Sequence, residues 1–421
     1  MRDAAPSARH AGFGPRPATR RPLLLTTTLL LAACSAATAA PSAGVAYVKG
    51  GEVWVTAGPA PSARRVPGTR GTVLLAASPV GGTLAVLTGP AGADVNADRA
   101  PLLTARLSRR PYTSTTLLST VVPDAALSRL PARWLTWSED GRTVLAGTDA
   151  GTRGWNVATR RALGVSATLW PPSTSLDGDV TAGIGSVASP DEPGVLLYGP
   201  GARPGTEVFS RSAPGNLMAA LRREPALRTF TEGLDPRAQA QDASWVVTPP
   251  RVTRDGQRVY FATNAGWGVG SGGSTTSAVF QVGVRDVALR ALGWLGTFSG
   301  SALELLPSPD GTALLLLHTR HTSNAEVSTA VSVADVAART RRPLTALAAP
   351  AGRVTVLAGA CWLADGRHVA LSAAQVNPAT LSAATAFVPP VSAFTLLVVE
   401  ARTGRVVQRV PGATQPACLP A

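Results

Sequence analysis

Residues 306–317 read "LPSPDGTALLLL", a polar turn set between two apolar runs. Asp310-Gly311 suits a tight hairpin, because glycine readily takes positive φ and aspartate accepts hydrogen bonds from nearby backbone amides. The apolar run after the turn is too short to cross a membrane. The stretch therefore predicts a β-hairpin of two buried strands.

Weaker copies of this hairpin recur along the chain. Their turn glycines stand at 81, 141, 178, 256, 311 and 366. In three copies a second pair of strands is predicted to follow, over residues 151–165, 329–347 and 394–410. A four-stranded unit of about 40 to 50 residues that repeats is typical of a β-propeller blade.

The count of units predicts an all-β, seven-bladed β-propeller, with six or eight blades as alternatives. Six turns begin six blades, and residues 44–66 match strands two to four of another blade that lacks its first strand. We expect residues 414–421 to supply that strand, so that the two ends of the chain close the ring. Closure leaves no sheet edge open to aggregation.

The turn Ser308-Pro309-Asp310-Gly311, with the Arg-rich closing hairpin near residues 336–344, resembles the WD40-like repeats of periplasmic TolB-type propellers. The resemblance covers most of residues 44–415, although only residues 308–311 keep the full turn motif. It implies a propeller fold and protein partners, namely envelope proteins or cell-wall-associated proteins.

The N-terminus has the pattern of an export signal. Basic residues precede an apolar run over 23–33, and "LAA" then stands before Cys34, which resembles a bacterial lipobox. We expect residues 1–33 to be a lipoprotein signal peptide, Cys34 to be lipidated and residues 34–43 to form a short tether. The protein would then be exported and lipid-anchored on the periplasmic or cell-surface face of the membrane. The alternative is an ordinary secretory signal cleaved within residues 37–44.

Cysteine use and charge limit the remaining possibilities. Cys361 and Cys418 are either a disulfide, as an oxidising compartment favours, or two buried thiols. The formal charge of +14 falls to +10 without the leader's five Arg and one Asp. Because the arginines are scattered among turns, we expect no nucleic-acid partner, and we expect a monomer.

Residues 201–243 exceed what a blade connection needs, so we expect an insertion in the propeller of residues 44–421. Asn216 is predicted to cap a short helix that reaches Glu224, with Leu217, Met218 and Leu221 on its apolar face. This helix either packs on the propeller rim or docks a partner.

Residues with catalytic chemistry are few. His318 and His321 stand three apart, which puts them on opposite faces of a strand, and His368 is remote in sequence. The glycines at 268, 270 and 273 precede a strand rather than the helix that a dinucleotide site requires. We therefore predict no metal site, no cofactor and no catalytic residue.

The expected function is an envelope-anchored, non-catalytic binding or scaffold propeller that mediates protein–protein interaction in a TolB-like manner. Two alternatives stay open: a propeller enzyme resembling lactonases or quinoproteins, and a carbohydrate-binding lectin. The nine tryptophans either pack between blades or line the channel mouth, and the lectin requires the second arrangement.

Overall fold

The computed structural model describes residues 44–56, 62–89, 103–121, 134–148, 151–166, 173–177, 179–185, 194–198, 206–209, 215–227, 246–265, 276–299, 302–323, 326–380 and 391–420. These residues belong to one compact unit, Pro41–Ala421. The leader and Cys34 lie outside them, so the predicted signal peptide, lipidation and tether stay predictions.

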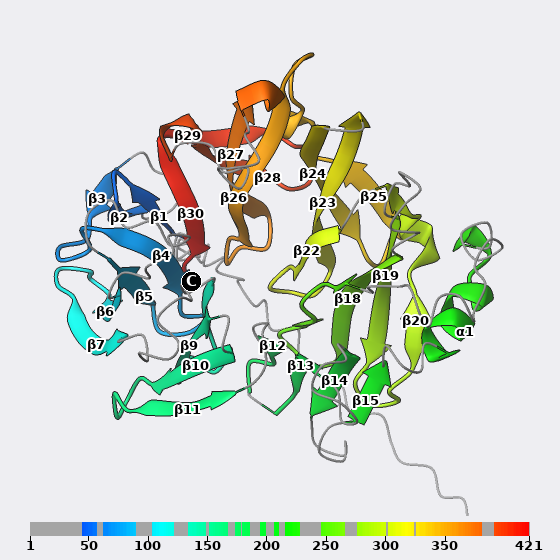
Figure 1. Ribbon diagram of the computed structural model, residues 1–421, viewed down its shortest axis with the longest axis horizontal. Helices are drawn as coiled ribbons and strands as arrows, with labels where there is room; N and C mark the ends of the chain where they lie inside the picture. The colour runs from blue at the N-terminus through cyan, green and yellow to red at the C-terminus, as the bar shows by residue number, and fades with distance from the viewer. Residues whose placement is uncertain are drawn as a thin grey trace, which may run out of the picture. The chain divides into compact units, whose positions relative to one another are not determined.

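The described strands form seven antiparallel sheets, numbered here in chain order (Figure 1). Sheet 1 contains β1 (Val45–Lys49), β2 (Glu52–Thr56), β3 (Ala63–Arg65) and the C-terminal β30 (Ala413–Cys418), and sheet 2 contains β4 (Thr72–Ala77), β5 (Thr83–Thr88), β6 (Leu103–Arg109) and β7 (Thr116–Val121). Sheet 3 contains β8 (Trp134–Trp137), β9 (Thr143–Thr148), β10 (Gly151–Asn156) and β11 (Ala162–Ser166). Sheet 4 contains β12 (Ser173–Thr174), β13 (Thr181–Gly185), β14 (Gly194–Tyr198) and β15 (Thr206–Phe209).

Sheet 5 contains β16 (Val246–Val247), β17 (Arg251–Val252), β18 (Arg258–Ala265), β19 (Thr276–Gly283), β20 (Leu289–Ala291) and β21 (Phe298–Ser299). Sheet 6 contains β22 (Ala302–Pro307), β23 (Ala313–Ser323), β24 (Glu326–Asp335) and β25 (Thr340–Pro343). Sheet 7 contains β26 (Val354–Trp362), β27 (His368–Val376), β28 (Thr395–Glu400) and β29 (Val406–Pro411). The helical segments are α1 (Gly215–Arg223), η1 (Pro225–Leu227), η2 (Gly293–Leu295), η3 (Thr345–Leu347), η4 (Pro378–Thr380) and η6 (Val391–Ala393).

The polar turn of the opening stretch is built as its sequence predicts. The Ser308 hydroxyl donates to Asp310 Oδ1 over 2.6 Å and accepts from the Ala313 amide over 2.9 Å. Asp310 Oδ1 also accepts from the Thr312 amide, and Gly311 has φ of +69°. The Ser–Asp pair thus satisfies the backbone donors of the turn and fixes where the second strand starts.

The same side-chain arrangement recurs in other sheets. Ser138–Asp140, Ser175–Asp177 and Thr253–Asp255 each place a hydroxyl on the carboxylate two residues later. In sheet 7 Leu363 replaces the hydroxyl residue, and Asp365 pairs with His368 instead. Because these turns are stabilised by local hydrogen bonds, the turn can recur although the residues around it differ between the copies.

The fold is an all-β propeller, as predicted, but it has six regular four-stranded blades and not the seven that were predicted; six was one of the two alternatives. Six sheets have four strands each, whereas sheet 5 has six. Its inner strand is divided into β16 and β17, both paired with β18. Pro249 and Pro250 stand at the division, where they offer no amide to the ladder. Its outer strand is divided into β20 and β21 by η2.

The two ends of the described chain meet in sheet 1. The C-terminal β30 pairs with β1 in antiparallel register, Cys418 opposite Val45 and Ala413 opposite Lys49. The side chain of Gln415 extends this junction to sheet 2, because it accepts from the Leu75 amide and donates to the Val73 carbonyl. The expectation that the C-terminal segment supplies the missing strand is therefore confirmed.

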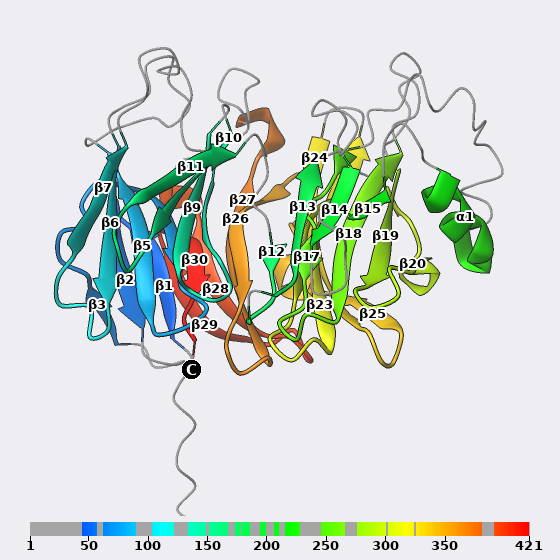
Figure 2. The same ribbon diagram turned by 90° about the horizontal axis from the view of Figure 1, so that it is seen from below.

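The sheets stand around a central axis (Figures 1 and 2). Shared buried clusters connect them in one series, from sheet 4 through sheets 5, 6, 7, 1 and 2 to sheet 3, and among the described residues no such cluster contains both sheets 3 and 4. Tryptophans contribute directly: Trp137 Nε1 donates to the Ala76 carbonyl of sheet 2, and Trp362 Nε1 donates to the Leu306 carbonyl of sheet 6. Trp137 and Trp362 therefore pack between sheets, and Trp362 also lines the axial pocket.

Helix α1 lies at the rim beside β20 (Figure 2). It begins at Gly215, so Asn216 stands inside the helix rather than at the predicted cap, and it ends at Arg223, one residue before the predicted end. Leu221 is fully buried in the cluster that sheets 4 and 5 share.

Candidate functional site

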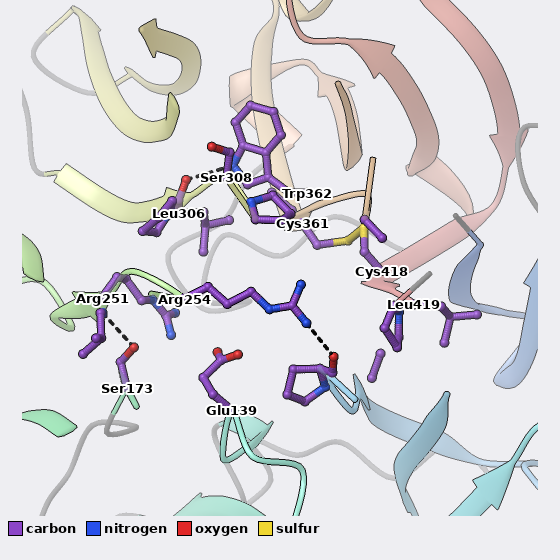
Figure 3. A pocket seen from close by; sticks show the side chains of 18 residues that line it. Glu139, Ser173, Arg251, Arg254, Leu306, Ser308, Cys361, Trp362, Cys418 and Leu419 are labelled. Carbon is purple, nitrogen blue, oxygen red and sulfur yellow. Dashed lines mark hydrogen bonds between the residues drawn. A yellow bond between two sulfur atoms is a disulfide. The ribbon is translucent and has the colours of Figure 1, made fainter. Parts of the chain in front are cut away.

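A pocket of about 270 Å³ lies on the axis, where the inner strands of all seven sheets end (Figure 3). One lining residue from each sheet, in the order of sheets 1 to 7, is Cys418, Ala77, Glu139, Ser173, Arg251, Leu306 and Cys361. Because every sheet contributes, the pocket exists only in the assembled ring.

The residue before the aspartate position of each turn supplies much of the pocket. Pro79, Glu139, Arg254, Pro309 and Ala364 all occupy this position in their respective sheets, and all five line the pocket. The turn geometry explained above fixes the backbone, while this one side chain is free to vary. The sequence predictions missed Glu139, Arg251 and Arg254; the place of Glu139 and Arg254 in the repeated turn is the signal that would have found these two, whereas Arg251 stands on the strand β17 before the turn.

Two arginines of sheet 5 line the pocket, and one of them reaches across it. Arg254 donates from Nη2 to the Pro79 carbonyl of sheet 2 over 3.1 Å, which places its side chain across the open space (Figure 3). Arg251 pairs through Nη2 with Glu304 of sheet 6. The Nε atoms of both arginines are buried and have no hydrogen-bond partner among the described residues.

Glu139 of sheet 3 supplies a negative charge to the same pocket. Burial raises the pKa of this carboxyl above its usual value, and the positive charges of Arg254 and Arg251 oppose the shift without cancelling it. The pocket thus sets one carboxyl of raised pKa against two guanidinium groups, in an environment where charges are only partly solvated.

The rest of the wall is mainly apolar. Leu306, Trp362 and Leu419 contribute large apolar surfaces, and several prolines stand between them. The disulfide Cys361–Cys418 forms part of the same wall, with its Cα atoms 5.8 Å apart, and joins sheet 7 to sheet 1. The structure therefore pairs the two cysteines that the sequence presented as disulfide candidates.

The predicted docking helix is placed only in part. The side chains of Leu217 and Met218 lie outside the described residues, and Leu221 is in the core and unavailable to a partner. A separate hollow of about 820 Å³ runs beside α1, with Arg223, Glu224 and Trp294 among its lining residues. A docking role for this helix stays a prediction.

The histidines stand apart from the pocket. His318 stacks at a tilt on Phe298, with ring centroids 4.8 Å apart, and His368 Nδ1 lies 2.7 Å from Asp365 Oδ2 in its turn. The side chain of His321 lies outside the described residues. In the described part of the chain, no group of three or more His, Cys, Asp or Glu is placed to hold a metal ion. No helix among these residues has the length and apolar character to cross a membrane.

Comparison with solved structures returns matches of low sequence identity. TolB from Acinetobacter baumannii is 15% identical, with a TM-score of 0.44 over 80% of this chain and 66% of that one. The tricorn protease is 9% identical, with a TM-score of 0.49 over 89% of this chain and 33% of that one. The Cps50 (Swd1) propeller domain from Myceliophteria thermophila is 12% identical, with a TM-score of 0.46 over 81% and 87%.

These likenesses carry no inference about activity. The chain spans 66% of the TolB chain and a third of the tricorn protease chain. A scan against protein-family models found no match, and a comparison with curated proteins found none either.

Proposed function

We propose that this protein is an exported, lipid-anchored binding propeller that holds partner proteins at the cell envelope without catalysing a reaction. In this proposal the axial pocket is the binding site.

The observation that carries the proposal is the convergence of all seven sheets on one pocket with charged groups at its centre. Arg251, Arg254 and Glu139 come from two different sheets, and the wall around them is apolar. An apolar wall with a few convergent polar groups is the usual composition of a recognition site. Function on a propeller resides in such a site and not in the fold itself.

Two features support export. The lipobox-like residues before Cys34 are one, and the disulfide Cys361–Cys418 is the other, because disulfides persist in oxidising compartments. A lipid on Cys34 would hold the ring beside the membrane through the short segment of residues 34–43. Envelope or cell-wall-associated proteins would then be the partners within reach.

A site-specific photo-cross-linker tests the proposal in intact cells. A benzophenone amino acid replaces Ala364, which lines the pocket, and in a matched variant it replaces Thr403, which is exposed in the turn between β28 and β29 and is not a lining residue. We expect irradiation at Ala364 to capture one or two recurrent envelope proteins that Thr403 does not capture.

Equal adducts from the two positions, or none from Ala364, would contradict a protein-binding role for the pocket. Both substitutions leave Arg251, Arg254 and Glu139 in place, so the two variants differ only in the position of the cross-linker.

A further inference from the structure

We infer that the axial pocket binds a carboxylate group carried on a short apolar body, either a free small acid or the C-terminal residue of a polypeptide. This inference rests on the binding role proposed above and names the chemistry of the ligand.

The cationic side of the pocket keeps N–H donors that its protein contacts do not use. Arg254 uses one Nη2 donor for the Pro79 carbonyl and Arg251 uses one for Glu304, whereas an arginine has five N–H donors. Their Nε–H groups are buried and have no partner among the described residues, so a ligand in the pocket would meet the Nη–H groups rather than these two. Carboxylates match the planar donor fork of arginine better than a lone neutral acceptor does.

The size and surface of the pocket restrict the rest of the ligand. At about 270 Å³ the pocket takes a small group or the end of a larger ligand. Leu306 and Trp362 offer apolar contacts to a short hydrocarbon chain or to one amino-acid side chain.

Glu139 sets the sign of the pH dependence. Charged groups that face it are Arg254 and Arg251, and Arg251 is in turn paired with Glu304. When Glu139 is ionised it repels an incoming carboxylate, and when it takes a proton the repulsion ends. Because the pKa of Glu139 is raised by burial, we expect binding to strengthen as the pH falls toward that raised pKa, and we compare pH 8 with pH 6, where simple carboxylic acids stay largely ionised.

Calorimetric titration of the purified full chain in mild detergent tests the inference. Hexanoate is compared with hexanamide, which has the same apolar chain and no charge. A second pair is N-acetyl-Ala-Ala-Leu with a free or an amidated C-terminus. We expect each acid to bind at least tenfold more tightly than its amide, through charge-assisted hydrogen bonds. Binding by the tripeptide alone identifies a chain terminus as the source of the carboxylate, and binding by hexanoate alone identifies a free acid.

Three variants locate the effect. Arg254→Gln should weaken hexanoate binding about tenfold, and Glu139→Gln should strengthen it about threefold at pH 7 and abolish the pH dependence. Arg142→Gln is the matched control, because Arg142 stands in the equivalent turn of sheet 3 with its side chain 83% exposed. It should bind as the wild type does.

Equal binding of acids and amides, or no binding by either acid, overturns the inference. If Arg254→Gln does not fold, because it loses the bond to Pro79, then Glu139→Gln decides: an unchanged affinity and an unchanged pH profile overturn it. The outcome is separable from that of the cross-linking experiment. Protein adducts at Ala364 without carboxylate binding would leave the proposed function standing and remove only the ligand class.

Discussion

The disulfide Cys361–Cys418 should hold the ring closed, and its removal offers a quantitative test of the fold. The two cysteines are separated by 57 positions, and they join the inner strand of sheet 7 to the C-terminal strand of sheet 1. On the chain-entropy relation, a loop of this length constrains the unfolded chain by about 4 kcal/mol. Since whole domains are stable by only about 5–15 kcal/mol, this is a large share.

The perturbation is the double variant Cys361→Ala/Cys418→Ala, and the assay is equilibrium unfolding in urea followed by tryptophan fluorescence. We expect the free energy of unfolding to fall by about 4 kcal/mol. Adding a reductant should bring the wild type to the same stability and should leave the double variant unchanged. A double variant that unfolds at the wild-type urea concentration, with both wild-type thiols bonded, would refute the reasoning, because β30 would then be held without the covalent link.

Three further predictions concern the turn, the contact between sheets and the leader. Asp310→Asn should lower stability at pH 7: partial burial alone would raise the pKa of this carboxyl, but hydrogen bonds from Ser308 and Thr312 lower it overall. The stability that the ionised carboxyl contributes is present above the usual carboxyl pKa and is lost as the pH falls through the lowered value. Thermal melts of the two proteins should therefore converge below about pH 4, and a constant difference would contradict the prediction. Trp137→Phe removes the bond to the Ala76 carbonyl and should cost about 1–3 kcal/mol in urea unfolding, since a buried carbonyl loses its partner; no change in stability would show that the bond contributes nothing. Cys34→Ala should abolish incorporation of labelled fatty acid and release the protein from the membrane fraction, whereas persistent labelling would place the lipid elsewhere.

Much of the ring could be predicted from one short phrase because that phrase is stable by local interactions. Ser308, Asp310 and Gly311 satisfy their own backbone groups within the turn, so the motif appears wherever a first and second strand meet. The closing strand at the C-terminus was also predictable, because residues 44–66 left one blade without an inner strand. Both inferences use properties that a few neighbouring residues determine.

Sheet 5 was harder to predict because the repeat that is aligned on Gly256 indicates a single strand before that turn. Pro249 and Pro250 lack the amides that one ladder would need, and the inner strand divides there. The two prolines were the signal, and the repeat pattern outweighed it.

The axial pocket was missed for a different physical reason. Glu139 and Arg254 each stand beside an aspartate in a polar turn, where a charged residue normally faces solvent. Only closure of the ring turns that position toward the axis, and closure depends on strands far apart in the sequence. No local pattern could show that Arg254 would reach the Pro79 carbonyl of sheet 2, 175 positions away.

This separation of roles has a consequence for how the site can change. In the repeated turns of sheets 3, 5 and 6 a hydroxyl residue, an aspartate and a glycine maintain the backbone, and the residue between hydroxyl and aspartate lines the pocket. Glutamate at 139, arginine at 254 and proline at 309 occupy this position, and Pro79 and Ala364 line the pocket from the corresponding position in sheets 2 and 7. Substitutions there change the charge and shape of the pocket while the bonds that form the turn persist. The chemistry of this propeller is therefore concentrated at a few turn positions, and Glu139 and Arg254 are the two such positions that carry charge.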